Sequence, residues 1–147
     1  MSIVLTQEEA DSLLALEKHF MRPDEFIYPS LGGAMRIELF SVDRREEFCL
    51  DITRSRVQLE KNTFQNRGRQ TVVLARLDFG GPMHRNPDDT EIPCPHLHIY
   101  REGFGDKWAI PLPDRFVGID KPTILLSEFM NYCQIITKPR VHEDLFT

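Results

Sequence analysis

The chain begins and ends with segments whose hydrophobic residues recur at helical spacing. In the first segment, Thr6 followed by Glu9 fits a capping box, and hydrophobic residues recur about every 3.6 positions until Pro23. We therefore expect an amphipathic helix over residues 7–20. A second helix is predicted over residues 120–134. Its buried stripe is predicted to contain Leu125, Leu126, Phe129 and Cys133.

Between these helices the hydrophobic period changes to two, which is typical of strands with one buried face. The segments with this pattern are residues 34–40, 48–53, 56–63, 70–78, 96–102 and 107–112. Residues 80–93 are rich in Gly, Pro and Asp and are predicted to form one long loop, and loops of that length are often functional. We expect an α+β fold, with an antiparallel sheet of about six strands flanked by an N-terminal and a C-terminal helix.

Composition narrows the class of protein. Of the 147 residues, 41% are hydrophobic and 10% are aromatic, which suffices for a single domain with one core. The three cysteines are far apart and form no Cys-x-x-Cys pair, so we expect free thiols in a reducing compartment. The first residues lack the features of a signal peptide, and no hydrophobic run is long enough to span a membrane. We therefore predict a cytoplasmic protein without membrane association.

The net charge of −5 is unevenly distributed along the chain. Residues 1–33 carry two basic and six acidic side chains, residues 34–85 carry ten and seven, and residues 86–147 carry six and ten. The middle segment is therefore basic and rich in arginine, which suits contacts with phosphate or carboxylate. The alternative interpretation is a solvated sheet face on which these arginines pair with neighbouring acids. Because the whole protein carries a net negative charge, it repels polyanions, and this repulsion favours the alternative interpretation.

One predicted strand carries the side chains most suited to chemistry. Residues two apart on a strand share a face, so His96, His98, Tyr100 and Glu102 should project together. Leu97 and Ile99 are expected to enter the core. We expect the histidine face to be exposed to solvent. Replacing either histidine should then change the free energy of unfolding by only about 0.5 kcal/mol or less.

The first functional interpretation is metal-independent cleavage of a phosphodiester, as in a ribonuclease. Two imidazoles can act as general base and general acid near neutral pH, and cationic side chains can stabilise charge that develops on the phosphate. The candidate catalytic residues are His84, His96, His98 and Tyr100. The candidate substrate-binding residues are Arg85, Arg101 and Lys107. This interpretation requires no cofactor and no metal ion, and its partner is RNA.

Two alternatives remain open. A His-x-His pair on a strand can direct two imidazoles at one metal ion, with Glu102, His84 or Cys94 as a further ligand. The spacing of His96, His98 and Glu102 resembles the first motif of the cupin family, but the upstream glycine and the second histidine motif are absent. The other alternative is a non-enzymatic inhibitor or accessory factor that contacts a protein partner through exposed aromatic and arginine side chains.

A longer block, residues 81–112, resembles the central block of a family of short bacterial proteins of unknown function. It contains the segments His84-Arg-Asn-Pro-Asp-Asp89 and Pro95-His-Leu-His-Ile-Tyr-Arg-Glu-Gly-Phe-Gly-Asp-Lys-Trp-Ala-Ile-Pro-Leu112. Because such families have no settled activity, the resemblance implies no catalytic residue. It implies a bacterial or mobile-element setting, in which small domains are often toxins, defence components or inhibitors of defence. We therefore rank the ribonuclease hypothesis narrowly first and the protein-binding inhibitor second.

Overall fold

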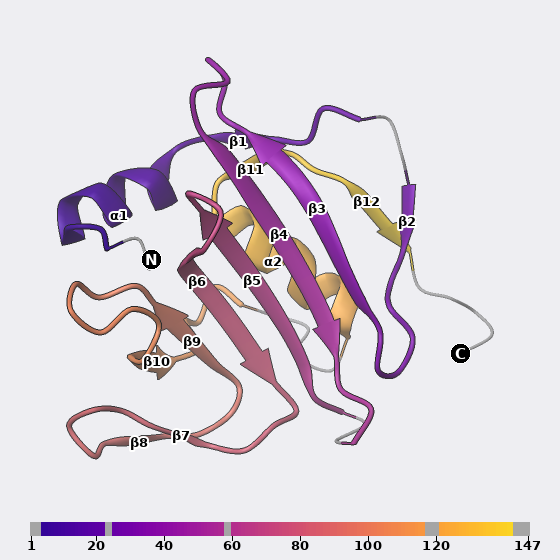
Figure 1. The fold of residues 1–147 in the computed structure, drawn as a ribbon. Helices are drawn as coiled ribbons and strands as arrows, with labels where there is room; N and C mark the ends of the chain where they lie inside the picture. The colour runs from indigo at the N-terminus through magenta and orange to yellow at the C-terminus, as the bar shows by residue number, and fades with distance from the viewer. Residues whose placement is uncertain (1–3, 23–24, 58–59, 117–120, 143–147) are drawn as a thin grey trace.

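The computed structural model describes residues 4–22, 25–57, 60–116 and 121–142. This part of the chain contains two helices and a large, mostly antiparallel sheet, so the fold is α+β (Figure 1). The helices are α1 (Gln7–Ala15) and α2 (Pro122–Tyr132). The eight strands of the large sheet are, in spatial order, β10 (Ala109–Pro111), β9 (His96–Ile99), β6 (Val72–Phe79), β5 (Asn62–Gly68), β4 (Glu47–Arg54), β3 (Ala34–Phe40), β1 (Lys18–His19) and β11 (Ile135–Thr137).

Neighbouring strands of the large sheet run antiparallel except at one edge, where β1 and β11 are parallel. Two small sheets complete the described strands. In one, β2 (Glu25–Ile27) pairs with β12 (Arg140–His142). In the other, β7 (His84–Arg85) pairs with β8 (Glu91–Ile92) inside the connection from β6 to β9. The long loop predicted at residues 80–93 is therefore an ordered hairpin beside the sheet.

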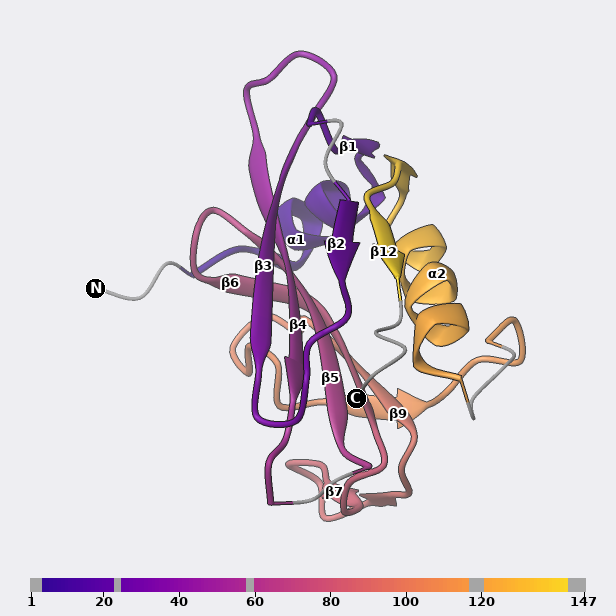
Figure 2. The ribbon, with the colours of Figure 1, turned by 90° about the vertical axis from the view of Figure 1, so that its right-hand side faces the viewer.

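Helix α2 covers one face of the sheet, and the hydrophobic core lies between them (Figure 2). Phe129 of α2 packs on Phe64 of β5, with ring centroids 6.1 Å apart. Its neighbours Leu125 and Leu126 are also fully buried, as the predicted stripe requires. Burial of this stripe against inward-pointing sheet residues is the main force that holds α2 in place.

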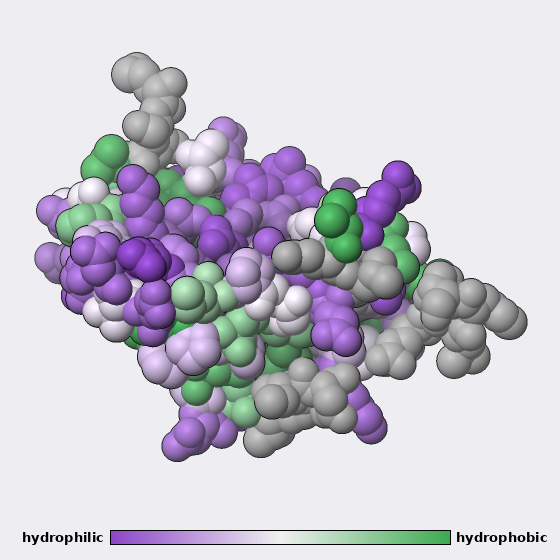
Figure 3. Space-filling model, turned by 90° about the horizontal axis from the view of Figure 1, so that it is seen from below, coloured by the Kyte–Doolittle hydropathy of each residue, from purple (hydrophilic) through white to green (hydrophobic). Residues whose placement is uncertain are grey.

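The other face of the central strands carries polar side chains. Pairing aligns Asp51 with Gln65 and then Gln65 with Arg76, so charged and amide groups form rows across β4, β5 and β6. In a view from below, hydrophilic residues dominate the upper part of the molecule and hydrophobic residues gather in its lower middle part (Figure 3). The sheet thus has one face buried under α2 and one polar face, as is common in antiparallel sheets.

The first helix is shorter than predicted: it ends at Ala15, and residue 20 lies well beyond it. The ammonium group of Lys18 donates to the carbonyl oxygens of Leu14 and Leu16, both at 2.9 Å. A longer helix would satisfy these carbonyls with its own N–H groups. Phe20 is buried, but it lies beyond β1 and not on the helix.

Other boundaries also differ from the prediction. The strand expected at residues 56–63 is wrong, because β5 starts only at Asn62; residues 58–59 lie outside the described part. The sheet has eight strands instead of about six, since the short β1 and β11 extend one edge. The strands predicted at 96–102 and 107–112 shorten to β9 and β10. Among the described residues, neither helix is long and hydrophobic enough to cross a membrane.

Candidate functional site

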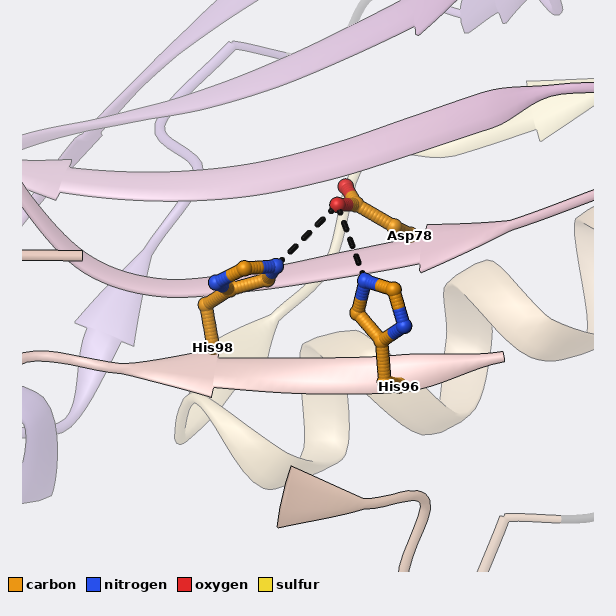
Figure 4. Close-up of side chains that lie close together, drawn as sticks. All are labelled: Asp78, His96 and His98. Carbon is orange, nitrogen blue, oxygen red and sulfur yellow. Dashed lines mark hydrogen bonds and ion pairs between the residues drawn. The ribbon is translucent and has the colours of Figure 1, made fainter. Parts of the chain in front are cut away.

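Pairing of β6 with β9 brings together two pairs of polar residues that are distant in sequence. Arg76 of β6 lies opposite His98 of β9, and Asp78 lies opposite His96. Side chains of directly paired residues point to the same face of a sheet, so all four meet on the polar face. Residues two apart on each strand therefore create one cluster, which we call the Asp78 cluster: Asp78, His96 and His98 (Figure 4).

Both imidazoles of the Asp78 cluster point at the same carboxylate oxygen (Figure 4). Asp78 Oδ2 lies 3.3 Å from His96 Nε2 and 3.2 Å from His98 Nε2. One donor atom from each of the three residues lies within 4.8 Å of the other two. Convergence of two imidazole nitrogens and a carboxylate oxygen is the geometry of a site that can hold a metal ion or share protons.

The other ring nitrogen of each histidine faces a backbone carbonyl. His98 Nδ1 donates to the carbonyl oxygen of Asp106 at 2.8 Å, and His96 Nδ1 lies 3.3 Å from that of Pro93. A carbonyl can only accept, so His98 carries its proton on Nδ1 when it is neutral. These contacts hold both rings with Nε2 toward Asp78.

Arg76 contributes a cation to the same cluster. Its guanidinium group contacts Asp78 at 3.2 Å through Nε and Asp106 at 2.7 Å through Nη1. Its Nη2 also lies 3.1 Å from His98 Nε2 and 3.3 Å from Asp78 Oδ2. Burial raises the pKa of Asp78, but the hydrogen bonds that His96 and His98 donate when their Nε2 atoms carry a proton, together with the charge of Arg76, outweigh burial and lower that pKa well below its usual value. Asp78 is thus a carboxylate throughout the neutral range.

His84 approaches the cluster from the β7–β8 hairpin. Its ring centroid lies 4.5 Å from that of His98 and 5.8 Å from that of His96. Its Nε2 donates to the carbonyl oxygen of Lys107 at 2.7 Å, which leaves Nδ1 as the acceptor in the neutral ring. His84 is half-buried, so it is the most accessible of the three histidines. The three imidazoles predicted as candidate site residues therefore do converge.

The expected exposure of the histidine face is wrong. His96 is 2% exposed and His98 is 1% exposed, as deeply buried as core residues such as Leu97. Alternation correctly placed the histidines opposite Leu97, but both faces of β9 are covered. The expectation that either histidine could be removed at a cost of about 0.5 kcal/mol therefore no longer holds, because a buried partner would be left unsatisfied.

By alternation Tyr100 lies on the same side of the chain as His96 and His98, but it contacts different residues. It is 7% exposed, and its hydroxyl group donates to the carbonyl oxygen of Leu5 at 2.7 Å and accepts from the Leu5 N–H at 3.0 Å. Glu102 accepts a hydrogen bond from the Gln7 N–H at 2.7 Å, next to the start of α1. Both side chains therefore tie β9 to the N-terminal segment.

The predicted substrate-binding cations lie apart from the Asp78 cluster. Arg85 pairs with Glu91 at 2.9 Å across the β7–β8 hairpin. The guanidinium group of Arg101 lies over Trp108, 4.2 Å from the ring centroid. Lys107 is exposed, and its backbone carbonyl binds His84. The sequence reasoning missed Asp78 and left Arg76 among many arginines; the Arg-x-Asp alternation at the end of a strand was the signal that could have found them.

A shallow groove of about 490 Å³ opens on the polar face beside the cluster. Its lining includes Arg76 and Asp78, so the groove reaches the cluster from the solvent side. The remaining lining residues are Thr53, Ser55, Lys61, Thr63 and Gln65. Cys94, the other ligand considered from sequence, does not point into the cluster, since its thiol donates to the Asp78 carbonyl oxygen at 3.3 Å.

Comparison with known proteins supports membership of a family but names no activity. A family described as "Family of unknown function (DUF6978)" matches residues 5–135, which include Arg76, Asp78 and all three histidines of the site. Neither curated proteins nor solved structures give a significant match. The match agrees with the resemblance of the central block to short proteins of unknown function. The chain therefore belongs to this family of unknown function, DUF6978.

Proposed function

We propose that this protein binds a divalent transition-metal ion through Asp78, His96 and His98. The observation that carries the proposal is the convergence of both Nε2 atoms on Asp78 Oδ2, at 3.2 and 3.3 Å. Ligands about 2.1 Å from one ion lie roughly 3.0 Å apart in an octahedron and roughly 3.4 Å apart in a tetrahedron. The two separations that involve Asp78 Oδ2 fall between these two values, and one donor atom from each of the three residues lies within 4.8 Å of the other two. The three groups are therefore near enough to hold one ion.

Contacts behind the ligands support metal binding. A histidine ligand usually donates its second ring N–H to a carbonyl or carboxylate, which fixes the ring and makes the ligating nitrogen more basic. His98 has this arrangement with Asp106, and His96 faces Pro93 in the same way. A preorganised pair of rings reduces the entropy that binding has to overcome.

The burial of His96 and His98 favours metal binding over direct acid–base chemistry on a large substrate. At 2% and 1% exposure, His96 and His98 cannot contact a large substrate without movement of the β7–β8 hairpin. A small ion needs only a narrow path, and its remaining coordination positions can hold water. Two nitrogens and one oxygen suit zinc, iron(II), manganese and related ions.

Part of the Arg76 side chain would have to move when an ion binds. Its Nη2 contacts both His98 and Asp78, so an ion between these ligands would displace that nitrogen. Its Nη1 keeps a partner in Asp106, at 2.7 Å. The side chain can therefore turn away from the ligands without losing every charged contact.

Metal analysis of protein purified without an affinity tag tests the proposal. We expect near-stoichiometric binding of added zinc, manganese or cobalt, and a cobalt absorption spectrum that reports nitrogen and oxygen ligands. Asp78→Asn and His98→Ala should each weaken binding by at least about tenfold. His142→Ala is the matched control, because His142 is exposed and pairs with Glu25 away from the site.

Two readouts keep this test decisive. Circular dichroism identifies any variant that fails to fold, and Asp78→Asn changes the ligand while preserving side-chain volume. Wild-type protein that stays folded, binds none of these ions and gains no thermal stability from them would refute the metal centre.

A second candidate function is the metal-independent phosphodiesterase or ribonuclease predicted from sequence. The observation in its favour is that three imidazoles and Arg76 converge beside an open groove. In this proposal His84 is the group that meets substrate, since it is the most accessible imidazole. Cleavage of RNA by protein stripped of metal with a chelator, lost in His84→Ala, would favour this candidate over the metal centre.

A further inference from the structure

We propose that the groove beside the Asp78 cluster binds a small ligand through a phosphate group. This inference rests on the proposed metal centre, because Asp78 is both a metal ligand and part of the groove wall. Its volume of about 490 Å³ falls within the range of small-molecule sites, roughly 300 to 1,000 Å³. A phosphate there would lie next to the ion.

The chemical lining of the groove suits an anion with several acceptor oxygens. Lys61 and Arg76 supply positive charge, Thr53 and Thr63 supply hydroxyl groups, and Gln65 supplies an amide. A phosphate group offers three acceptor oxygens, which such a set of donors can satisfy together. The groove lies on the polar face of the sheet, which α2 does not cover.

One cation on this face has no acidic partner among the described residues. Asp51 is neutralised by Arg67, whose Nε lies 2.6 Å away, and Asp78 is neutralised within its own cluster. The carbonyl oxygen of Lys61 accepts from the Ser55 N–H at 3.0 Å, but its ammonium group makes no hydrogen bond or ion pair with the described residues. An unpaired cation beside a metal ion favours a negatively charged ligand.

Lys61 is held where it can serve the groove. Its aliphatic chain lies over Gly81, where an added Cβ would meet Lys61 Cδ at 3.3 Å and Cγ at 3.4 Å. The lack of a side chain at Gly81 leaves room for this packing. Lys61 is thus a groove residue that the sequence reasoning did not select.

Another hollow, of about 600 Å³, is a weaker candidate. It lies along the edge strand β10 and shares no lining residue with the Asp78 cluster. Arg101, which lines it, is already stacked on Trp108. The charged residues that line this hollow do not lie beside the Asp78 cluster, whereas Lys61 and Arg76 line the groove next to it.

The test uses inorganic phosphate and manganese-loaded protein. Phosphorus NMR should show broadening of the phosphate signal beyond that caused by the same concentration of free manganese. Lys61→Met should weaken phosphate binding by at least about tenfold while leaving the bound manganese unchanged. Lys121→Met is the matched control, since Lys121 is exposed at the start of α2.

The outcomes separate this inference from the metal centre. Stoichiometric manganese without excess broadening would overturn the phosphate site and leave the metal centre in place. Phosphate shifts of the Thr63 and Gln65 amide signals that disappear in Lys61→Met, in protein that binds no metal, would support the groove and overturn the metal centre. Weakening by Lys107→Met instead of Lys61→Met would also overturn the groove, because Lys107 does not line it.

Discussion

At the residue scale, a fully buried lysine joins the ends of the two helices. The ammonium group of Lys18 donates to the carbonyl oxygens of Leu14 and Leu16 at 2.9 Å and of Cys133 at 2.8 Å. It also lies 4.7 Å from the centroid of the Phe48 ring. Leu14 and Leu16 belong to the end of α1 and Cys133 caps α2, so one cation satisfies the last carbonyls of both helices.

The contribution of Lys18 to stability should change with pH. Burial lowers the pKa of Lys18 from 10.5 to about 8 in the folded protein. Between these values the unfolded chain binds more protons, so the free energy of unfolding rises with pH. Since one pKa unit corresponds to about 1.4 kcal/mol, wild type should gain roughly 1 kcal/mol relative to Lys18→Met between about pH 8 and 9.

Urea unfolding of both proteins over this range provides the measurement. The range stops near pH 9 because burial raises the pKa of the Cys133 thiol to about 12, which gives a contribution of the opposite sign at higher pH. A constant difference between wild type and Lys18→Met across the range would contradict the prediction.

At the element scale, β9 shows why a strand pattern leaves its surroundings open. The alternation of His96, Leu97 and His98 correctly separates two faces. The Leu97 face packs in the core, and the His84 ring of the β7–β8 hairpin lies 4.5 Å from His98 on the other face. A segment 12 residues before His96 therefore converts an expected exposed face into a buried polar cluster.

The end of β6 offers a test of how the connection to this hairpin is held. Gly80 has a φ of +72°, and an added Cβ would lie 1.8 Å from the Glu60 carbonyl oxygen. Gly103 has a φ of +84° with nothing within 4 Å. Both alanine variants bear the cost of positive φ, about 1 kcal/mol, but only Gly80→Ala adds a backbone collision. We expect Gly80→Ala to lose at least about 2 kcal/mol more than Gly103→Ala in urea unfolding. Equal losses would show that the chain at Gly80 moves aside without cost.

At the scale of the whole molecule, four of the nine arginines of the basic middle segment pair with carboxylates. Arg67, Arg69, Arg76 and Arg85 each pair with a carboxylate within 3.2 Å. This is the arrangement expected for a solvated sheet face. These pairs weaken the support that the arginine surplus gives to nucleic-acid binding, and the protein-binding alternative stays a prediction.

The three free thiols should report on unfolding of the whole molecule. Cys49 is 7% exposed and Cys133 is fully buried, whereas Cys94 is half-buried. Under native conditions a thiol reagent should modify Cys94 first, and the other two roughly a hundredfold or more slowly, because they become accessible only through opening of the core. Stopped-flow absorbance with Cys94→Ser as control measures both phases. A fast phase that persists in Cys94→Ser would place a second thiol at the surface.

The sequence alone determined the elements that depend on neighbouring residues. The capping box at Thr6 and the stripe of α2 are confirmed, since both depend on contacts within one helix turn or on helical period. The strand pattern around His96 and His98 is equally local. The family of unknown function that the sequence predicted is shown by a match over residues 5–135. Element ends were less well predicted, because the end of α1 depends on Lys18 and on a carbonyl of α2.

Only the tertiary structure decided which residues the histidines meet. Asp78 lies 18 residues before His96, and their contact depends on the register in which β6 pairs with β9. A shift of one residue would turn Asp78 to the other face of the sheet. Register is determined by hydrogen bonds and packing over the whole sheet, so a pattern along one segment shows which side chains share a face but not what covers that face.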